Sequence, residues 1–507
     1  MRGPDITGAP GTAARLLFRG TPVARGAVLA AAALALAACT GTPSTASGAG
    51  HPATATPTAT RTVSPTAGHP TTAGGPTATY PGAAWPTYNQ NPARTGIAPG
   101  LAAAGPLSRK WTAALDGAVY GQPLVVGGLV IAATESDTVY ALDEATGKTV
   151  WSAHLAAPVP QSELNGCGDI FPLGITGTPV YDQANGLVYA VAETTVNGMV
   201  AHELFGLSVS DGAVMVRRDV DITSAANQPA YNQQRPALTI EDGRVYVAFG
   251  GLYGDCGSYI GSVVGVPLSG SGSLISWHTP TSREGAVWGT GGPVTGPGGS
   301  LWISNGNGAA GPGDGYDGSD SVTELSPALQ RTGYFAPGTW ATDNASDLDL
   351  GSTQPVLAAG DAVFVMGKGG VGYLLAATHL GGIGGQLAEQ SICNARGAAA
   401  VAGSTVYEPC QDGGMAAIDV DAATRTIKVL WRGPADANGS PVIGGGAVWV
   451  TSYSDDGGTL YELNPATGAV EQQIAIGQGM PHFSSLSLSG STAYVSTLSG
   501  VTAVSGA

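Results

Sequence analysis

The sequence predicts an all-β protein, an eight-bladed β-propeller with four-stranded antiparallel blades, and three observations support this prediction. One short pattern recurs eight times between residues 122 and 497. The chain contains 79 Gly, a residue type that suits many tight turns between short strands. Long stretches with a hydrophobic period of 3.6 residues are missing from the sequence, so we expect almost no helix.

Each copy of the repeat places an apolar strand, a turn rich in Gly or Asp, and a second apolar strand that usually carries an aromatic residue. The equivalent positions in the second strand are Ile131, Tyr189, Tyr246, Trp302, Phe364, Tyr407, Trp449 and Tyr494. They recur at intervals of 42 to 62 residues, which leaves room for four short strands in each copy. A period of this size is typical of a propeller blade.

The two ends of the repeat region predict how the ring closes. After Ser484 the chain has room for only three strands, whereas a lone strand, "LSRKWTAAL" at 107–115, precedes the first copy. We therefore expect 107–115 to supply the fourth strand of the last blade. Such pairing of the N- and C-terminal strands would remove the open sheet edges at which proteins aggregate.

The N-terminal residues predict an exported, lipid-anchored protein. Residues 1–38 are interpreted as a lipoprotein signal peptide, because basic residues precede an apolar run at 26–38 that is too short to span a bilayer. The run ends in "LAAC", similar to a bacterial lipobox, so Cys39 is expected to carry the lipid; a secretory signal with a chance Cys is the alternative. Residues 39–82 are almost entirely Thr, Ala, Pro, Gly and Ser, which predicts a disordered tether. The propeller is then expected over 83–507, outside the cell and anchored at the outer face of the cytoplasmic membrane.

The charge of the chain excludes some partners. The formal net charge is −16 at pH 7, and removal of 1–38, which contain four Arg and one Asp, would make it more negative. Nucleic acid binding depends on many Lys and Arg contacts to phosphate, so we expect no nucleic acid partner. Like-charge repulsion favours a soluble monomer, with the lipid anchor as its contact to the membrane.

The remaining cysteines predict two disulfides. Apart from Cys39 there are four Cys, an even number that suggests disulfides in an exported protein. In a propeller, the loops between second and third strands lie on the same face as the loops that join blades. Cys167 and Cys393 fall in joining loops, and Cys256 and Cys410 fall at second-to-third-strand loops. We therefore predict Cys167–Cys256 between two blades and Cys393–Cys410 within one, with free buried thiols as the alternative.

The same face is the candidate binding face, because the longest predicted loops, 193–203, 250–261 and 305–321, also lie there. The starts of the innermost strands should surround the channel at this face. They offer five candidate binding residues: Arg235, Trp288, Asp349, Arg396 and His482. The alternative is that these side chains line a solvated channel mouth without a ligand.

Four segments resemble the pyrroloquinoline-quinone-like (quinoprotein alcohol dehydrogenase-like) β-propeller superfamily. "AAWPTYNQNPARTG" at 83–96 is similar to its leading segment and "VYALDEATGKTVW" at 139–151 to its tryptophan-docking motif. "GAVWGTGGPVTGPGGSLWISNGNG" at 285–308 and "NASDLDLGSTQPVL" at 344–357 resemble later blades. The resemblance covers nearly all of 84–507 and implies the propeller fold. It leaves the function open, because the superfamily includes alcohol dehydrogenases and non-enzymatic lipoproteins of the outer-membrane assembly factor B type.

The dehydrogenases of this superfamily hold pyrroloquinoline quinone (PQQ) over the central channel with calcium bound by Glu, Asn and Asp, and often have two adjacent disulfide-linked Cys. This sequence has no adjacent Cys pair and no haem motif, and the ligand set does not match it residue by residue. "DGYDGSD" at 314–320 lacks EF-hand spacing, because its Asp residues are three apart. We therefore assign no catalytic or metal-binding residue, and we predict that Trp151 packs neighbouring blades together.

The sequence favours a binding or scaffold protein of the cell envelope, with an envelope protein or a glycan as its partner. The alternative is a PQQ-dependent alcohol dehydrogenase that uses PQQ and Ca²⁺. Fold alone does not decide between the two, because one fold carries many functions.

Overall fold

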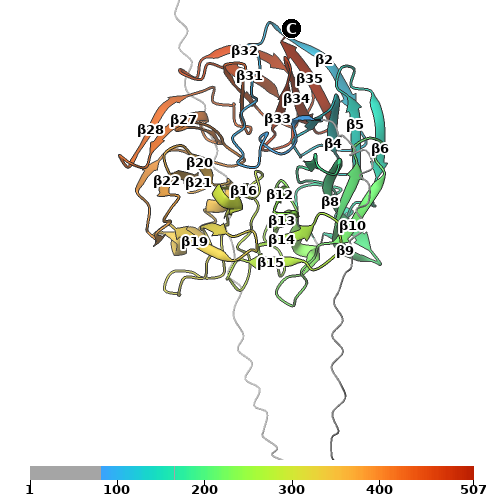
Figure 1. Cartoon of the computed structure of the whole chain (residues 1–507). Helices are drawn as coiled ribbons and strands as arrows, with labels where there is room; N and C mark the ends of the chain where they lie inside the picture. The colour runs from blue at the N-terminus through green and yellow to red at the C-terminus, as the bar shows by residue number, and fades with distance from the viewer. Residues whose placement is uncertain (1–81, 165, 507) are drawn as a thin grey trace, which may run out of the picture. The chain divides into compact units, whose positions relative to one another are not determined.

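The computed structural model describes residues 82–164 and 166–506, so the predicted signal peptide, the lipidation site Cys39 and nearly all of the tether lie outside the described residues. Figure 1 shows the described strands as eight sheets around a common centre. The described helices are α1 (Trp340–Asn344) and four short 3₁₀ turns: η1 (Gln161–Glu163), η2 (Pro229–Tyr231), η3 (Pro297–Gly299) and η4 (Leu350–Ser352). None of these is long and apolar enough to cross a membrane. The predicted eight-bladed all-β propeller is confirmed.

The first four blades each contain four consecutive antiparallel strands that run from the centre outwards, in chain order. They comprise β3 (Leu124–Val126), β4 (Leu129–Ala133), β5 (Thr138–Asp143) and β6 (Thr149–His154); β7 (Val180–Asp182), β8 (Leu187–Val196), β9 (Met199–Ser208) and β10 (Val214–Asp219); β12 (Thr239–Glu241), β13 (Arg244–Gly251), β14 (Ser262–Pro267) and β15 (Ile275–His278); and β16 (Val294–Thr295), β17 (Leu301–Ser304), β18 (Val322–Leu325) and β19 (Arg331–Ala336).

The last four blades repeat this order. They comprise β20 (Val356–Ala358), β21 (Ala362–Met366), β22 (Val371–Ala376) and β24 (Ala388–Ser391); β25 (Ala400–Ala402), β26 (Thr405–Cys410), β27 (Gly414–Asp421) and β28 (Thr426–Arg432); β29 (Val442–Gly444), β30 (Ala447–Thr451), β31 (Thr459–Leu463) and β32 (Val470–Ala475); and β33 (Leu486–Ser489), β34 (Thr492–Thr497), β35 (Gly500–Gly506) and β2 (Leu107–Ala114). Three further strands are β1 (Ala83–Trp85) beside β3, β11 (Asn232–Gln233) beside β13, and β23 (Gly382–Ile383) parallel to β19.

The ring closes as the sequence predicts. β2 pairs antiparallel with β35 over its whole length, from the pair Leu107 and Gly506 to the pair Ala114 and Gly500. Figure 1 shows β2, β35, β34 and β33 side by side, with the first and last parts of the propeller in one blade. The two ends of the ring are therefore held together by backbone hydrogen bonds.

One predicted loop is wrong. Residues 193–203 do not form a loop. They belong to a long hairpin in which β8 and β9 stay paired up to a turn at Asn197 and Gly198. Both turn residues have positive φ, 53° and 78°, as a two-residue Asn-Gly hairpin turn requires. The predicted loops 250–261 and 305–321 are mostly without strands, between β13 and β14 and between β17 and β18.

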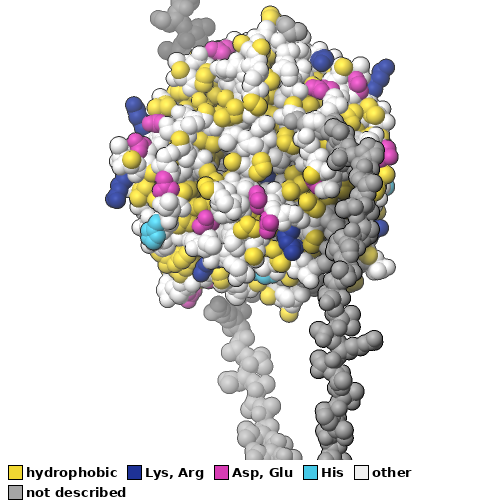
Figure 2. All heavy atoms as spheres, viewed as in Figure 1, with side chains coloured by type: hydrophobic (Ala, Val, Ile, Leu, Met, Phe, Trp, Pro, Cys, Tyr) yellow, Lys and Arg dark blue, Asp and Glu magenta, His cyan; other side chains and the backbone are white. Residues whose placement is uncertain are grey.

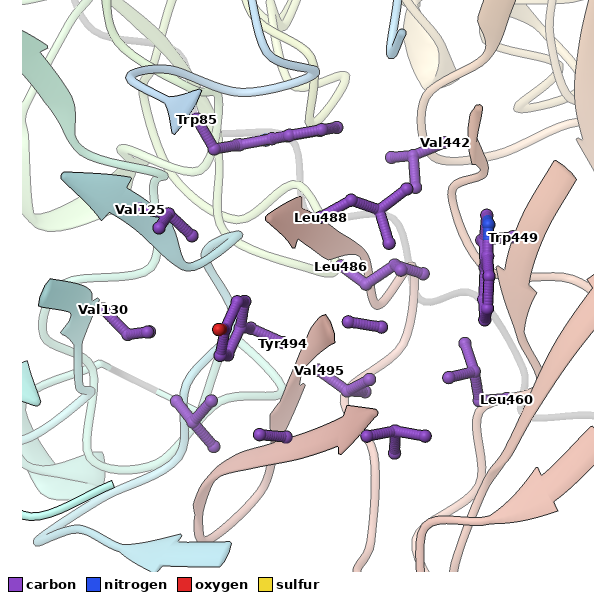
Figure 3. Close-up of a cluster of buried hydrophobic side chains, with 14 of the residues drawn as sticks. Trp85, Val125, Val130, Val442, Trp449, Leu460, Leu486, Leu488, Tyr494 and Val495 are labelled. Atoms are coloured by element: carbon purple, nitrogen blue, oxygen red, sulfur yellow. The ribbon is translucent and has the colours of Figure 1, made fainter. Parts of the chain in front are cut away.

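The core lies between the blades. The eight equivalent residues of the second strands are all buried, and each cluster of apolar side chains between the strands combines residues of neighbouring blades. Trp151 belongs to the cluster between the first two blades, as predicted for the docking motif. Figure 3 shows the largest cluster, where Trp85 of β1 extends toward Val442 and lies near Leu488.

A segment that follows β1, residues 86–98, crosses the centre of the ring and is called here the channel segment. Its backbone hydrogen-bonds to innermost strands of several blades, including the pair Thr95 O and Val401 N and the pair Gly96 O and Ile443 N. Arg94 is 2% exposed and donates to the carbonyls of Tyr88 and Leu238, both at 2.9 Å. The segment therefore links first strands from opposite sides of the propeller.

Candidate functional site

The structure brings the five predicted binding residues to one cavity. A cavity of about 590 Å³ opens among the loops that join blades, and Arg235, Trp288, Asp349, Arg396 and His482 all line it. This volume is typical of small-molecule sites in proteins. Each of the five residues lies shortly before the innermost strand of a different blade. The topology of the ring therefore brings them to one place. A ligand for these residues remains a prediction.

The channel segment lies next to this cavity on the channel side. Arg235, His482 and Phe483 also line a second, much smaller cavity that reaches Tyr88 of the channel segment. Tyr88 is 2% exposed and lies 3.4 Å from Thr290 between their hydroxyl oxygens. Buried side chains therefore close the large cavity on the side of the channel segment.

Lys368 holds two acidic residues together on one side of the cavity. Its Nζ lies 2.6 Å from Asp347 Oδ1 and 2.7 Å from Asp349 Oδ2, with the Lys368 side chain 14% exposed. Asn307 donates its backbone N–H to Asp349 Oδ1 at 2.7 Å and its side-chain amide to Asp347 Oδ1 at 3.0 Å. Burial lowers the pKa of Lys368, but the two carboxylates outweigh burial and raise it. Lys368 is therefore charged, and it also lies 5.4 Å from the ring of Trp288.

Another part of the cavity lining combines basic and aromatic groups. The guanidinium of Arg235 lies over the Phe483 ring, with 4.8 Å from Cζ to the ring centroid. The rings of Tyr453 and Trp288 also contact Phe483, at centroid distances of 6.1 and 6.2 Å. The Tyr453 hydroxyl donates to the Gln411 side chain. The aromatic rings are thus packed against one another and present a rigid wall.

His482 packs against Phe483 and is uncharged at pH 7. Burial and the charges of Arg235 and Arg396 lower the pKa of His482 to about 3, so the imidazole is neutral at pH 7. Its Nε2 lies 3.7 Å from Asp169 Oδ2, beyond hydrogen-bonding distance. A neutral His in this place is an uncharged polar contact rather than an ion-pair partner.

Sequence reasoning missed Lys368, Asn307 and Phe483. Lys368 lies in the loop between β21 and β22, a second-to-third-strand loop, so the argument that placed the cysteines on this face could have found it. Asn307 lies in the predicted loop 305–321. Phe483 has a φ of 61°, which turns its side chain beside that of His482, and no sequence pattern predicts this conformation.

Two disulfides frame the cavity face. Cys167–Cys256 joins the loop before the second blade to the β13–β14 loop, with 6.3 Å between Cα atoms. Cys393–Cys410 lies at the sixth blade, with 5.6 Å between Cα atoms. The first disulfide holds the 252–255 stretch that lines the cavity. Figure 2 shows acidic and basic side chains interspersed over the described residues on one face of the molecule, without a large patch of one sign.

The residues of the cavity do not fit a bound calcium ion as they stand. Asn307 Oδ1 is buried without a partner, and with Asp347 and Asp349 it would supply oxygen ligands. Lys368 already provides the positive charge between those carboxylates. Within 82–164 and 166–506 no group of three or more His, Cys, Asp or Glu side chains is arranged to hold a metal ion. In the "DGYDGSD" loop, Asp317 accepts hydrogen bonds from Thr281 and Ser319.

The eight blades and the closure by β2 form a β-propeller, and comparisons with known proteins show which propellers it is similar to. Residues 108–309 match the family model described as outer membrane protein assembly factor BamB. A search of the curated proteins gave no match. The chain has the PQQ-like β-propeller fold of the family that its sequence motifs resemble.

Solved structures with this fold are similar over most of the chain. The quinohemoprotein alcohol dehydrogenase of Pseudomonas putida HK5 has 15% sequence identity and a TM-score of 0.64, over 83% of this chain and 80% of that one. The quinohemoprotein alcohol dehydrogenase of Comamonas testosteroni has 15% identity and a TM-score of 0.61, with the same coverage. BamB of Moraxella catarrhalis has 15% identity and a TM-score of 0.53, over 78% and 97%. At this identity the likeness concerns the fold alone.

Proposed function

We propose that this protein is a non-enzymatic binding or scaffold protein of the cell envelope that recognises its partner at the cavity face. The observation that carries the proposal is the Lys368 bridge between Asp347 and Asp349, which neutralises the oxygen ligands that a catalytic cation would need. The match to the BamB family model over 108–309 supports a role with an envelope protein. A glycan is the other partner class that we propose.

The location belongs to the same proposal. We infer that Cys39 carries a lipid, that 39–82 tether the propeller, and that the propeller acts as a monomer outside the cytoplasmic membrane. The support is the lipobox-like sequence and the two disulfides, which are typical of an oxidising compartment. Labelling of the cells with a radioactive fatty acid should mark the wild-type chain and leave Cys39→Ala unlabelled.

A photo-crosslinker at the cavity rim tests the binding role. Tyr253 is 71% exposed and lines the cavity, so a photoreactive phenylalanine analogue at this position should crosslink to a specific envelope protein or glycan in the native host. Val470 is 42% exposed on the outer strand β32 and serves as the control position. Equal crosslinking from both positions, or none from Tyr253, would refute recognition at this face.

The alternative function is a PQQ-dependent alcohol dehydrogenase. It is favoured by the buried Asn307 Oδ1 without a partner beside Asp349, an arrangement that a metal would satisfy if Lys368 moved away. Bound PQQ would supply two-electron oxidation of an alcohol, with Asn307 and Asp349 as metal ligands. Titration of the full chain with PQQ and excess calcium, followed by quenching of tryptophan fluorescence, decides between the two. Saturable, calcium-dependent quenching together with dye reduction by alcohols would replace the binding proposal.

A further inference from the structure

The loop before the second blade and the β13–β14 loop form one exposed surface beside the cavity. We propose that this surface docks a basic segment of a protein partner, with Phe171 and Tyr253 as apolar anchors and with nearby carboxylates as partners of its Lys or Arg residues. The surface is called here the crosslinked platform and comprises residues 159–164, 166–173 and 252–256. The inference deepens the proposed binding function and rests on it, because it names the chemistry of the partner.

Two aromatic side chains of the platform are exposed, although aromatic rings gain free energy when they are buried. Phe171 is 44% exposed and Tyr253 is 71% exposed. Both lie beside Gly168, whose backbone N–H donates to the carbonyl of Tyr253 at 3.0 Å, and a Cβ built on Gly168 would lie 3.8 Å from Cε1 of Phe171. Neighbouring exposed aromatic residues are typical of protein-binding surfaces.

The platform is fixed in this conformation by several kinds of contact. Val159 and Leu173 exchange backbone hydrogen bonds of 2.8 and 3.0 Å, which close the loop before the second blade. The Cys167–Cys256 disulfide joins this loop to the β13–β14 loop. A cluster of buried side chains lies beneath the two loops and comprises Val159, Leu164, Cys167, Ile170, Leu173 and Leu252. A surface that is fixed before binding loses little conformational entropy when a partner docks.

The platform is acidic. Its acidic residues are Glu163, Asp169 and Asp255, all of them exposed, and the sequence of 159–173 and 252–256 contains no Lys or Arg. Asp169 also lines the cavity that contains Arg235.

Glu163 and Asp255 are the carboxylates that remain for a partner. They accept hydrogen bonds from the hydroxyls of Thr195 and Tyr259, at 2.7 and 2.6 Å, and these neutral donors leave the negative charge in place. Neither carboxylate forms an ion pair in the described part of the chain, where Lys368 pairs with Asp347 and Asp349 instead.

Charge complementarity favours a basic segment over other occupants. A second copy of this chain would bring the same carboxylates to the contact, and an anionic lipid surface would repel them. Lys and Arg side chains pair with carboxylates and also bind the faces of Tyr and Phe rings. A segment with basic and apolar residues would therefore use both features of the platform.

Fluorescence anisotropy of short labelled peptides, titrated with the full chain, tests the inference. The probe peptide contains Lys, Phe and Gly; one control peptide has Glu in place of each Lys, and the other has Gly in place of each Phe. We expect saturable binding of the probe with a Kd below about 0.1 mM, and binding of either control at least about tenfold weaker. Binding of the probe should also weaken as salt rises from about 0.05 to about 0.5 M, because ions screen exposed charges.

Variants of the platform locate the contact. Tyr253→Ser should weaken binding of the probe about tenfold, and Met215→Ser, at a position 65% exposed on β10, is the matched control. Glu163→Gln and Asp255→Asn should each weaken it about two- to fivefold. Asp242→Asn, at an exposed turn between β12 and β13, should leave binding unchanged. The amide variants keep the acceptor oxygens of the folded loops, so they test the charge requirement even if Tyr253→Ser fails to fold.

Three outcomes of these titrations would overturn the inference: the probe does not bind, the Glu control binds as tightly, or the platform variants retain wild-type affinity. They are separable from the proposed function. If Tyr253 crosslinks to a glycan, or to an envelope protein while the probe does not bind, the basic partner is wrong and recognition at the cavity face stands. If the probe binds through the platform and Tyr253 crosslinks to nothing in the host, the chemistry of the surface stands and the envelope role is wrong. A crosslink between two copies of the chain would overturn both.

Discussion

The indole ring of Trp151 lies directly against Gly212 of the next blade. A Cβ built on Gly212 would come within 2.6 Å of the ring, and the indole N–H donates to the carbonyl of Val209 at 2.9 Å. The same arrangement joins other neighbouring blades through the pairs Trp111 and Gly147, and Trp431 and Gly468. The docking motif thus makes a packing contact between blades. The tryptophan in the outermost strand of one blade lies against the turn that precedes the outermost strand of the next blade.

Gly212→Ala should therefore destabilise the fold. Both Gly212, with φ of 74°, and Gly243, with φ of 70°, have left-handed backbones, but nothing lies within 4 Å of a Cβ on Gly243. The two alanine variants share the backbone penalty of about 1 kcal/mol, and only Gly212→Ala adds overpacking of about 1–3 kcal/mol. Chemical denaturation of both variants measures the difference. Equal losses of stability would contradict the packing role of this contact.

Arg94→Met should be strongly destabilising. The side chain of Arg94 donates to two carbonyls, of Tyr88 and Leu238, and to the hydroxyls of Thr87 and Thr239. Methionine would leave these buried acceptors without donors, at a cost of about 2–6 kcal/mol. Arg331→Met on the exposed face of β19 is the control for loss of a charge. An unfolding free energy equal to that of the control would mean that the channel segment is not held by Arg94.

A buried cluster of titratable groups lies between the first three blades. His202 Nδ1 lies 2.7 Å from Asp221 Oδ1, and its Nε2 lies 3.4 Å from Glu193 Oε1. Glu135 Oε2 accepts a hydrogen bond from a backbone N–H, whereas both oxygens of Asp137 are buried without a partner among the described residues. Burial raises the pKa of Glu135 to about 8 and, with nearby carboxylates, that of Asp137 to about 9.

The stability of the protein should consequently fall as pH rises from 5 to 9. Between its ordinary pKa and its raised pKa, each carboxyl binds a proton in the folded state but not in the unfolded state. His202 acts in the same direction, because its two carboxylates outweigh burial and raise its pKa to about 10. Its stabilisation is complete below its ordinary value of 6.5 and is lost toward pH 10.

Unfolding titrations at pH 5, 7 and 9 measure this slope. Asp137→Asn should reduce it by up to about 1.4 kcal/mol per pH unit, because the amide does not titrate. Asp456→Asn, at an exposed loop position, should leave the slope unchanged. A stability that is constant or rises between pH 5 and 9 would show that these carboxyls are not protonated in the folded protein.

Lys368→Ala should create a metal site where the wild-type chain has an ion pair. Without the ammonium, Asp347, Asp349 and Asn307 Oδ1 remain as oxygen ligands near Trp288, which can sensitise terbium luminescence. We expect terbium emission from Lys368→Ala, reversed by calcium, and none from the wild type or from Lys368→Arg, which keeps the charge. Equal emission from the wild type would mean that metal displaces Lys368, and would favour the dehydrogenase alternative.

The blades could be predicted because their information is local. Tyr189, Trp302 and Phe364 occupy equivalent places in a repeated strand-turn-strand pattern. Successive side chains of a strand point to opposite faces of the sheet, and each of these three points to a buried face. The candidate residues Arg235 and His482 could be placed on one face because loop parity is a property of the topology. Equivalent reasoning brought together Cys167 and Cys256, 89 residues apart.

The sequence by itself thus determined the repeat, the closure of the ring and the face that carries the cavity. Only the tertiary structure decided the partners of buried charges, such as Arg94 with Leu238, Lys368 with Asp349 and His202 with Asp221. It also decided that the channel segment crosses the ring. The physical reason is that strand periodicity records which side of a sheet a residue faces, whereas the partner of a polar group depends on distances across several blades. Hydrogen bonds to backbone carbonyls, in particular, leave no pattern in the residues that accept them.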